Sequence, residues 1–169
     1  SMLKDELTSR HSPAVMSIAC GSCRELVEIS PEISHSGAHI TAIDNDEDAL
    51  HYAQSRLYYT GIQSSVEFRK YNAPRLFDHD IAEQDFGQQD IIYSVGLFDY
   101  LETDFLVKMR DSLYRLLSDG GKMILAFKDA RKYRSQVYHW FMDWYGFLQR
   151  YEEDFRDILS AARIPESAI

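Results

Sequence analysis

The stretch Val15–Glu32 constrains the fold more than any other part of the chain. A short apolar run, Val15–Ala19, leads into a turn of small residues, Cys20–Cys23, and then into a helical pattern. About twenty residues beyond the turn, a second apolar run, Ala38–Asp44, ends in an acid. A strand, a tight turn, a helix and an acid-tipped strand form a layout that suits an adenosyl-type cofactor. Small residues let the backbone approach the ligand, the helix N-terminus offers free N–H groups, and the acid can take ribose hydroxyls.

Strand and helix patterns continue to alternate up to residue 127. Apolar runs predict strands at Val66–Lys70, Asp90–Val95 and Met123–Phe127, and helical periodicity predicts helices at Glu47–Tyr59, capped by Asp46, and at Asp104–Leu117. We also expect helices at Lys4–Arg10, Ser22–Ser30 and Glu152–Ala162, with turns at Ser34–Gly37 and Ser118–Gly121. Five such repeats predict a parallel sheet with helices on both faces.

Length and composition narrow the class of protein. The 169 residues fit one domain, which we divide into a leading segment (1–13), a cofactor-binding core (14–128) and a helical acceptor-side region (129–169). A net charge of −9 argues against nucleic acid as the main partner. No apolar run reaches the roughly 20 residues of a membrane span. The two cysteines make no disulfide framework, so we expect a cytoplasmic protein.

With these residues in view, the chain resembles the class I S-adenosylmethionine-dependent methyltransferases. V-M-S-I-A-C-G-S-C, at residues 15–23, stands where that family has its glycine-rich first motif, and Tyr71-Asn72-Ala73 matches its turn at the adenine. The resemblance implies an α/β fold, a Rossmann-like three-layer α/β/α sandwich with a parallel sheet in the order 3-2-1-4-5. It also implies S-adenosylmethionine as the cofactor and a small-molecule methyl acceptor. The cofactor-binding residues that it implies are Ala19, Cys20, Gly21, Asp44, Asn45, Asn72, Ala73, Ser94, Val95 and Gly96.

The chain departs from the family pattern in several places. Ser17 occupies the slot of an acid, Ala19 and Cys23 replace the outer glycines, and Asn72 replaces the acid after the third strand. A family sheet usually ends in two further strands, for which only residues 163–169 are left, so we expect the sheet to lack them or to be completed elsewhere. A truncated edge invites pairing with a second copy.

The acceptor side is expected after the fourth strand. Asp99 and Tyr100 are the predicted catalytic residues, with Asp99 positioning the acceptor or acting as a base, although it could equally cap the next helix. Residues 94–101 and 143–151 resemble a bacterial branch linked to methyl-ester formation on 3-hydroxy fatty acids, which implies a fatty-acid-like carboxylate acceptor. An aromatic stretch, Tyr138–Phe147, would roof this site or belong to the core.

Two other functions stay open from the sequence. Cys20 and Cys23 form a C-x-x-C at a strand-to-helix turn, the arrangement of a thiol redox pair whose pKa a helix N-terminus would lower. A zinc site would need two more ligands, and no second C-x-x-C follows, so no metal site is predicted. The chain could also bind the cofactor without turnover, as a fragment of a larger enzyme.

Overall fold

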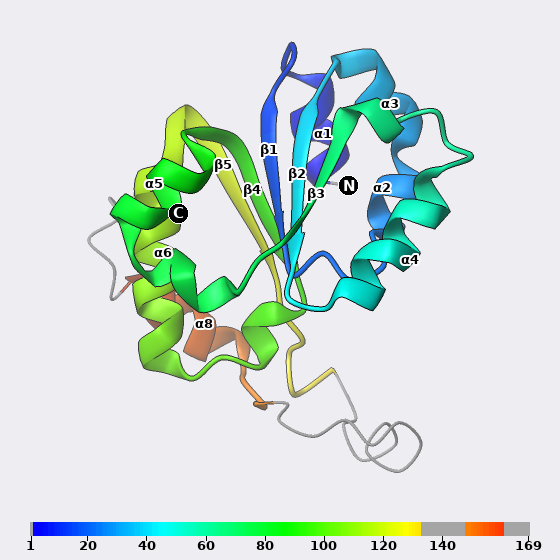
Figure 1. Cartoon of the computed structure of the whole chain (residues 1–169). Coiled ribbons are helices and arrows are strands. Elements are labelled where there is room, and N and C mark those ends of the chain that lie inside the picture. The colour runs from blue at the N-terminus through cyan, green and yellow to red at the C-terminus, as the bar shows by residue number, and fades with distance from the viewer. Residues whose placement is uncertain (1, 133–147, 161–169) are drawn as a thin grey trace.

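The computed structural model describes residues 2–132 and 148–160. Within these ranges one all-parallel sheet runs in the order β3-β2-β1-β4-β5, which confirms the predicted topology (Figure 1). The strands are β1 (Ala14–Ile18), β2 (His39–Asp44), β3 (Val66–Lys70), β4 (Gln89–Val95) and β5 (Leu117–Ala126).

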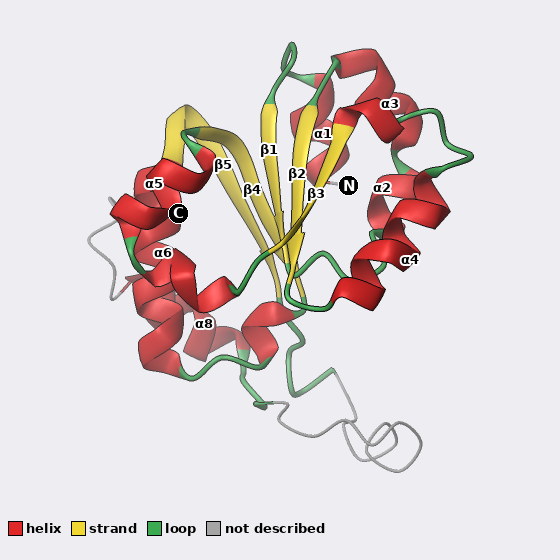
Figure 2. Ribbon diagram, in the orientation of Figure 1, coloured by secondary structure: helices red, strands yellow, loops and turns green. Residues whose placement is uncertain are grey.

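Helices cover both faces of the sheet, as Figure 2 shows. One face carries α1 (Met2–Thr8), α2 (Arg24–Glu28), α3 (Ser30–Ser36) and α4 (Glu47–Leu57), and the other carries α5 (His79–Phe86), α6 (Thr103–Leu116) and α8 (Glu152–Ser160). Short 3-10 helices span Gln63–Ser65 (η1), Ala73–Phe77 (η2) and Leu97–Asp99 (η3). The predicted three-layer sandwich is therefore present.

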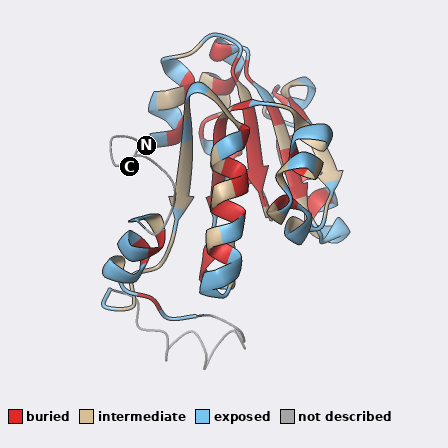
Figure 3. Cartoon of the chain, turned by 90° about the vertical axis from the view of Figure 1, so that its left-hand side faces the viewer, coloured by how far each residue is buried: buried red, intermediate tan, exposed pale blue. Residues whose placement is uncertain are grey.

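Alternation along the strands divides the core into two layers. Val15 and Ile91 pack against the α1–α4 layer, whereas their neighbours Met16 and Ile92 pack against the α5, α6 and α8 layer. Side chains of a strand point alternately to the two faces, so runs of apolar residues are needed where both faces are covered. The three central strands are mostly buried, while β5 at the edge is mostly half-buried (Figure 3).

The predicted helix over Ser22–Ser30 is wrong in its bounds. Cys23 lies in the left-handed region (φ 48°), so α2 begins only at Arg24, and a second helix, α3, follows from Ser30. Pro31 lies in the first turn of α3, where proline is tolerated because those N–H groups have no helical acceptor. The expected turn at Ser34–Gly37 is therefore helical up to Ser36, and it turns only at Gly37 (φ 67°).

The bounds of other predicted elements differ less from those observed. Asp46 caps α4 as expected, because its Oδ1 accepts from the N–H groups of Asp48 and Ala49 at 2.9 and 3.3 Å. Ser118–Gly121 belongs to β5 instead of forming a separate turn, and β5 carries extra residues there, where its register with β4 shifts.

Two stretches with sequence predictions lie outside the described residues: the aromatic segment 138–147 and the final residues 163–169. The three-part division of the chain therefore stays a prediction. No helix in the described ranges is long and apolar enough to cross a membrane.

Candidate functional site

Three of the predicted turns are joined at the carboxyl edge of the sheet by hydrogen bonds that backbone N–H groups donate. Parallel strands all end at this edge, so segments far apart in sequence come together there (Figure 1). Asp44, at the end of β2, is the centre. Its Oδ2 accepts from the Gly21 N–H at 2.8 Å, and its backbone carbonyl accepts from the Tyr71 N–H at 2.8 Å. The turns after β1, β2 and β3 therefore form one connected unit.

The turn after β1 has a contorted backbone. Ala19, Gly21 and Cys23 all have positive φ, at 51°, 50° and 48°. The Cys20 N–H donates to the Ile43 carbonyl at 3.0 Å, which ties the turn to β2. A Cβ placed on Gly21 would meet no atom within 4 Å, so open space lies beside the turn. Small residues thus give a strained turn that a ligand can approach closely.

Asp44 is half-buried and has bonding capacity left. Its Oδ1 accepts from the Asp46 N–H at 3.0 Å, so each carboxylate oxygen holds one backbone N–H. An ionised carboxylate offers about four acceptor positions, and further donors such as hydroxyls could bind it. Asn45 follows on the exposed side of the turn.

The turn after β3 brings Asn72 and Ala73 to the same edge. Asn72 is exposed, and its carbonyl accepts from the Arg75 N–H at 3.0 Å as η2 begins at Ala73. Beside them lies a cluster that the sequence analysis missed. The Tyr71 hydroxyl donates to Asp85 Oδ2 at 2.8 Å, and the Arg75 guanidinium lies 5.4 Å from the centre of the Tyr71 ring. The hydrogen bond from Tyr71, together with Arg75, lowers the pKa of Asp85.

The three cofactor-binding residues predicted at the end of β4 have different surroundings. Ser94 is buried, and its Oγ donates to the Ile18 carbonyl at 2.9 Å, so this side chain joins β4 to β1. Val95 is 60% exposed although it is apolar. Gly96 has a φ of 99°, which a side chain would strain, and open space surrounds its Cα.

A hollow of about 460 Å³ opens between the ends of β1, β4 and β5. It is bordered by Ala19, Val95, Gly96, Leu97, Asp99, Tyr100, Ala126, Phe127 and Lys128. The structure therefore brings the predicted catalytic pair, Asp99 and Tyr100, next to three predicted cofactor residues. Asp44, Asn45, Asn72 and Ala73 lie outside its lining, on the β2–β3 half of the edge.

Asp99 is the buried polar residue of the hollow, with 2% of its surface exposed. Its Oδ1 accepts from the Lys128 N–H at 3.1 Å, whereas Oδ2 has no hydrogen-bond partner among the described residues. Burial raises the pKa of Asp99, although the Lys128 N–H and the charges of Lys128 and Arg150 oppose the shift. Tyr100 beside it is partly exposed.

Arg150 holds the loop after β4, a role that the sequence analysis did not predict. It is buried, and its guanidinium donates to the Phe98 carbonyl at 2.9 Å and to the Leu101 carbonyl. The Leu148 N–H donates to the Asp99 carbonyl at 2.8 Å. One short segment, 148–150, thus fixes the backbone on both sides of Asp99. A hint of this role was present in the sequence, because Arg150 lies within residues 143–151, one of the two stretches that carry the narrower family resemblance.

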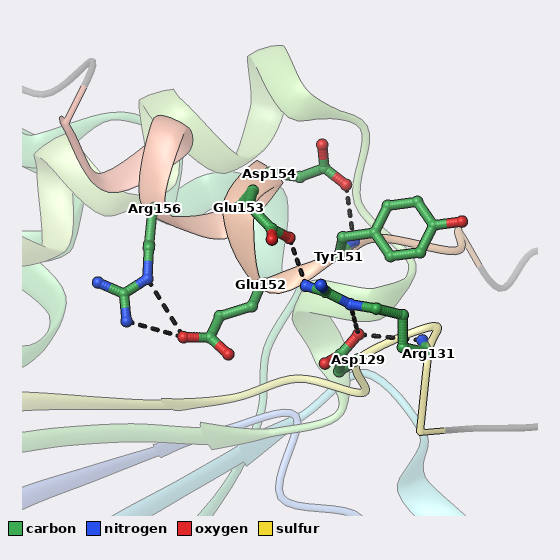
Figure 4. Close-up of polar contacts among 7 residues, drawn as sticks. All are labelled: Asp129, Arg131, Tyr151, Glu152, Glu153, Asp154 and Arg156. Atoms are coloured by element: carbon green, nitrogen blue, oxygen red, sulfur yellow. Dashed lines mark hydrogen bonds and ion pairs between the residues drawn. The ribbon is translucent and has the colours of Figure 1, made fainter.

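The start of α8 is linked to the segment after β5 by charged side chains (Figure 4). Arg131 pairs with Glu153 and Asp129, and the Tyr151 N–H donates to Asp154 Oδ2 at 2.7 Å. Phe127 and Phe155 stack with their ring centres 4.0 Å apart. These contacts place α8 against the β5 side of the hollow.

Cys20 and Cys23 are both free and buried. Hydrogen bonding to Cys20 and burial raise the pKa of Cys23 far above its ordinary value, which is opposite to the lowering expected for a reactive thiol. The short α2 carries too little dipole to reverse this effect. Within the described ranges, no three His, Cys, Asp or Glu side chains group closely enough to hold a metal ion.

Comparison with known proteins identifies a family and a set of similar folds. The family described as "Methyltransferase domain" matches residues 15–121. A comparison with curated proteins found no match. Among solved structures, a possible exported protein from Bordetella parapertussis has a TM-score of 0.72 and 18% identity, over 94% of this chain and 58% of that one.

Two further solved structures have methyltransferase names. The SAM-dependent methyltransferase from Geobacter sulfurreducens, in complex with S-adenosyl-L-homocysteine, gives a TM-score of 0.54 and 20% identity, over 73% of this chain and 45% of that one. A TehB-like SAM-dependent methyltransferase from Corynebacterium glutamicum gives a TM-score of 0.58 and 16% identity, over 93% of this chain and 70% of that one. At these identities the likeness concerns the fold. The chain spans about half the length of the first two structures.

Proposed function

The chain belongs to the methyltransferase domain family, and we propose that it transfers a methyl group from S-adenosylmethionine to a small-molecule acceptor. The observation that carries this proposal is Asp44, which joins the turns after β1 and β3 while keeping free acceptor positions. S-Adenosylhomocysteine in the Geobacter relative also supports the choice of cofactor.

In this proposal the cofactor lies along the carboxyl edge. The main chain of Ala19–Gly21 would hold its methionine end, and Asp44 with Asn45 would accept the ribose hydroxyls. Asn72 and Ala73 would flank the adenine, where the exposed Asn72 side chain offers both a donor and an acceptor. Ser94 would contribute through its backbone only, because its hydroxyl is bonded to Ile18. Val95 and Gly96 would lie on the methyl-donor side.

The hollow beside Asp99 and Tyr100 would hold the acceptor. Methyl transfer is an in-line displacement on a carbon that the sulfonium already activates, so the protein mainly has to align the reactants and exclude water. The apolar border of the hollow suits the second task. A carboxylate of a fatty-acid-like acceptor, as in the narrower sequence resemblance, needs no base for this step.

A calorimetric titration with S-adenosylhomocysteine tests the proposal. We expect one binding site per chain, followed by methyl transfer when S-adenosylmethionine and 3-hydroxydecanoate are supplied together. Absence of binding at millimolar ligand would overturn the assignment of the cofactor. Binding without transfer to any acceptor tried would favour the second candidate, a cofactor-binding fragment, for which the partial coverage of the solved structures is the relevant observation. The cytoplasmic location and the pairing of two copies stay predictions.

A further inference from the structure

The hollow has a mainly apolar border that includes the buried Asp99, one of whose oxygens has no hydrogen-bond partner among the described residues. Leu97, Ala126 and Phe127 supply apolar surface, and Val95 stays largely exposed there. Exposed apolar side chains around a concave site favour an apolar ligand. Asp99, Tyr100 and Lys128 are the polar residues of the border, and one oxygen of Asp99 is buried without a hydrogen-bond partner in the part of the chain that the structure describes.

An unpartnered buried carboxylate oxygen is costly, because it has lost water without gaining a donor. No hydrogen bond from the described residues around Asp99 reaches that oxygen. The Lys128 N–H binds the other oxygen, and the Arg150 guanidinium, which lies behind the loop, donates to the carbonyls of Phe98 and Leu101 instead. Among the described residues Asp99 forms no ion pair.

The position of Asp99 is also held from several directions. Its carbonyl accepts from Leu148, its Oδ1 accepts from Lys128, and Arg150 fixes the residues before and after it. A side chain fixed in this way cannot easily turn toward solvent to satisfy Oδ2. A donor that enters from the hollow, which Asp99 borders, would pair this oxygen.

We propose that Asp99 selects acceptors, and that the hollow binds a molecule with an apolar body and an O–H or N–H group that donates to Asp99 Oδ2. Asp99 is then a specificity-determining residue, and acceptors that lack the donor bind poorly because the buried oxygen stays unpaired. The inference rests on the proposed function only in identifying this ligand as the methyl acceptor. A hydroxylated fatty acid would satisfy it with its hydroxyl while its carboxylate is methylated.

A pair of neutral probes tests this selection. 4-Butylphenol and 4-butylanisole share an apolar body, but only the phenol donates a hydrogen bond. With the protein saturated with S-adenosylhomocysteine, we expect the phenol to bind about tenfold more tightly, as a hydrogen bond to a charged group allows. Chemical shifts of the Ala19, Val95 and Leu97 methyl groups would report binding in the hollow. Equal affinities, or no shifts at these groups, would overturn the inference.

The variant Asp99→Asn sharpens the test. Its amide oxygen can still accept from the Lys128 N–H, which turns the NH₂ group toward the position of Oδ2. Both probes can accept from that group, so the preference for the phenol should disappear while the protein stays folded and keeps its affinity for S-adenosylhomocysteine. The matched control is Asp129→Asn, which lies outside the lining of the hollow and should keep the preference.

The two proposals fail in different ways. Absence of a phenol preference in the unchanged protein, with intact S-adenosylhomocysteine binding, contradicts only the role of Asp99. The probe titrations are therefore repeated without S-adenosylhomocysteine. A phenol preference in a protein that does not bind S-adenosylhomocysteine contradicts only the proposed function. A preference that persists in Asp99→Asn would also reject Asp99 as the selecting residue.

Discussion

On the β1–β2–β3 half of the carboxyl edge, polar groups bind one another. On the β4–β5 half, Asp99 borders a mainly apolar hollow, and one of its oxygens has no hydrogen-bond partner within the described ranges. Asp44 holds backbone N–H groups on both of its oxygens, while Asp99 holds one on only one oxygen. The first half is pre-organised by its own hydrogen bonds and needs little rearrangement to take a polar ligand. The second half keeps unused bonding capacity, which suits the selection of a ligand.

The largest effect is expected on the β4 side, from Arg150→Met. This change leaves the buried carbonyl of Phe98 and the partly buried carbonyl of Leu101 without their donor, at about 1–3 kcal/mol for each unpaired group. We expect the free energy of unfolding, measured with urea, to fall by about 2–4 kcal/mol. The affinity for S-adenosylhomocysteine should stay close to that of the unchanged protein, because the Asp44 side is built independently.

Arg156→Met is the matched control for that variant. Arg156 is exposed and pairs with Glu152 within α8, so its loss should change stability by about 0.5 kcal/mol or less. Equal destabilisation by both variants would show that Arg150 does not hold the loop.

On the β2 side, Asp44→Ala should weaken the binding of S-adenosylhomocysteine about tenfold or more, corresponding to about 1.4 kcal/mol. The change removes the acceptor of the Gly21 N–H together with the proposed ribose ligand. Calorimetry measures the affinity, and Asp48→Ala, in the first turn of α4, serves as the control. An unchanged affinity would remove Asp44 from the site.

The pH dependence of stability tests the burial of Asp99. Burial raises the pKa of Asp99 in the folded chain above its value in the unfolded chain, about 3.9. The folded state therefore binds this proton more tightly, and the associated stability is present at low pH and lost as pH rises through the folded pKa. In urea unfolding between pH 4 and pH 8, Asp99→Asn should gain stability relative to the unchanged protein as pH rises. A constant difference would contradict the raised pKa.

The smallest effect is expected for Cys23→Ser. Cys23 shapes the turn through its backbone, and its thiol is buried with a raised pKa, so S-adenosylhomocysteine affinity should change less than about twofold. Thiol labelling of the folded protein should be slow. Fast labelling together with loss of dithiol activity in the variant would favour the redox function.

Local patterns predicted the elements that depend on nearby residues. The bounds of β3 matched their prediction, Asp46 capped α4, and Asp44 ended β2 at the edge where it was expected. The break between α2 and α3 was missed. It depends on the left-handed backbone of Cys23 and on Pro31 in the first turn of α3, and both features can also mark the end of a helix.

The sequence by itself determined the alternation of strands and helices, and hence a parallel sheet with its acid-tipped turn, because these features arise from periodicity and from residues close in the chain. Only the tertiary structure decided that Ser94 bonds to Ile18, that Arg150 holds the loop around Asp99, and that one oxygen of Asp99 has no hydrogen-bond partner among the residues described. These contacts join residues about fifty or more positions apart. Their geometry is set by how the layers pack, and no local pattern encodes it.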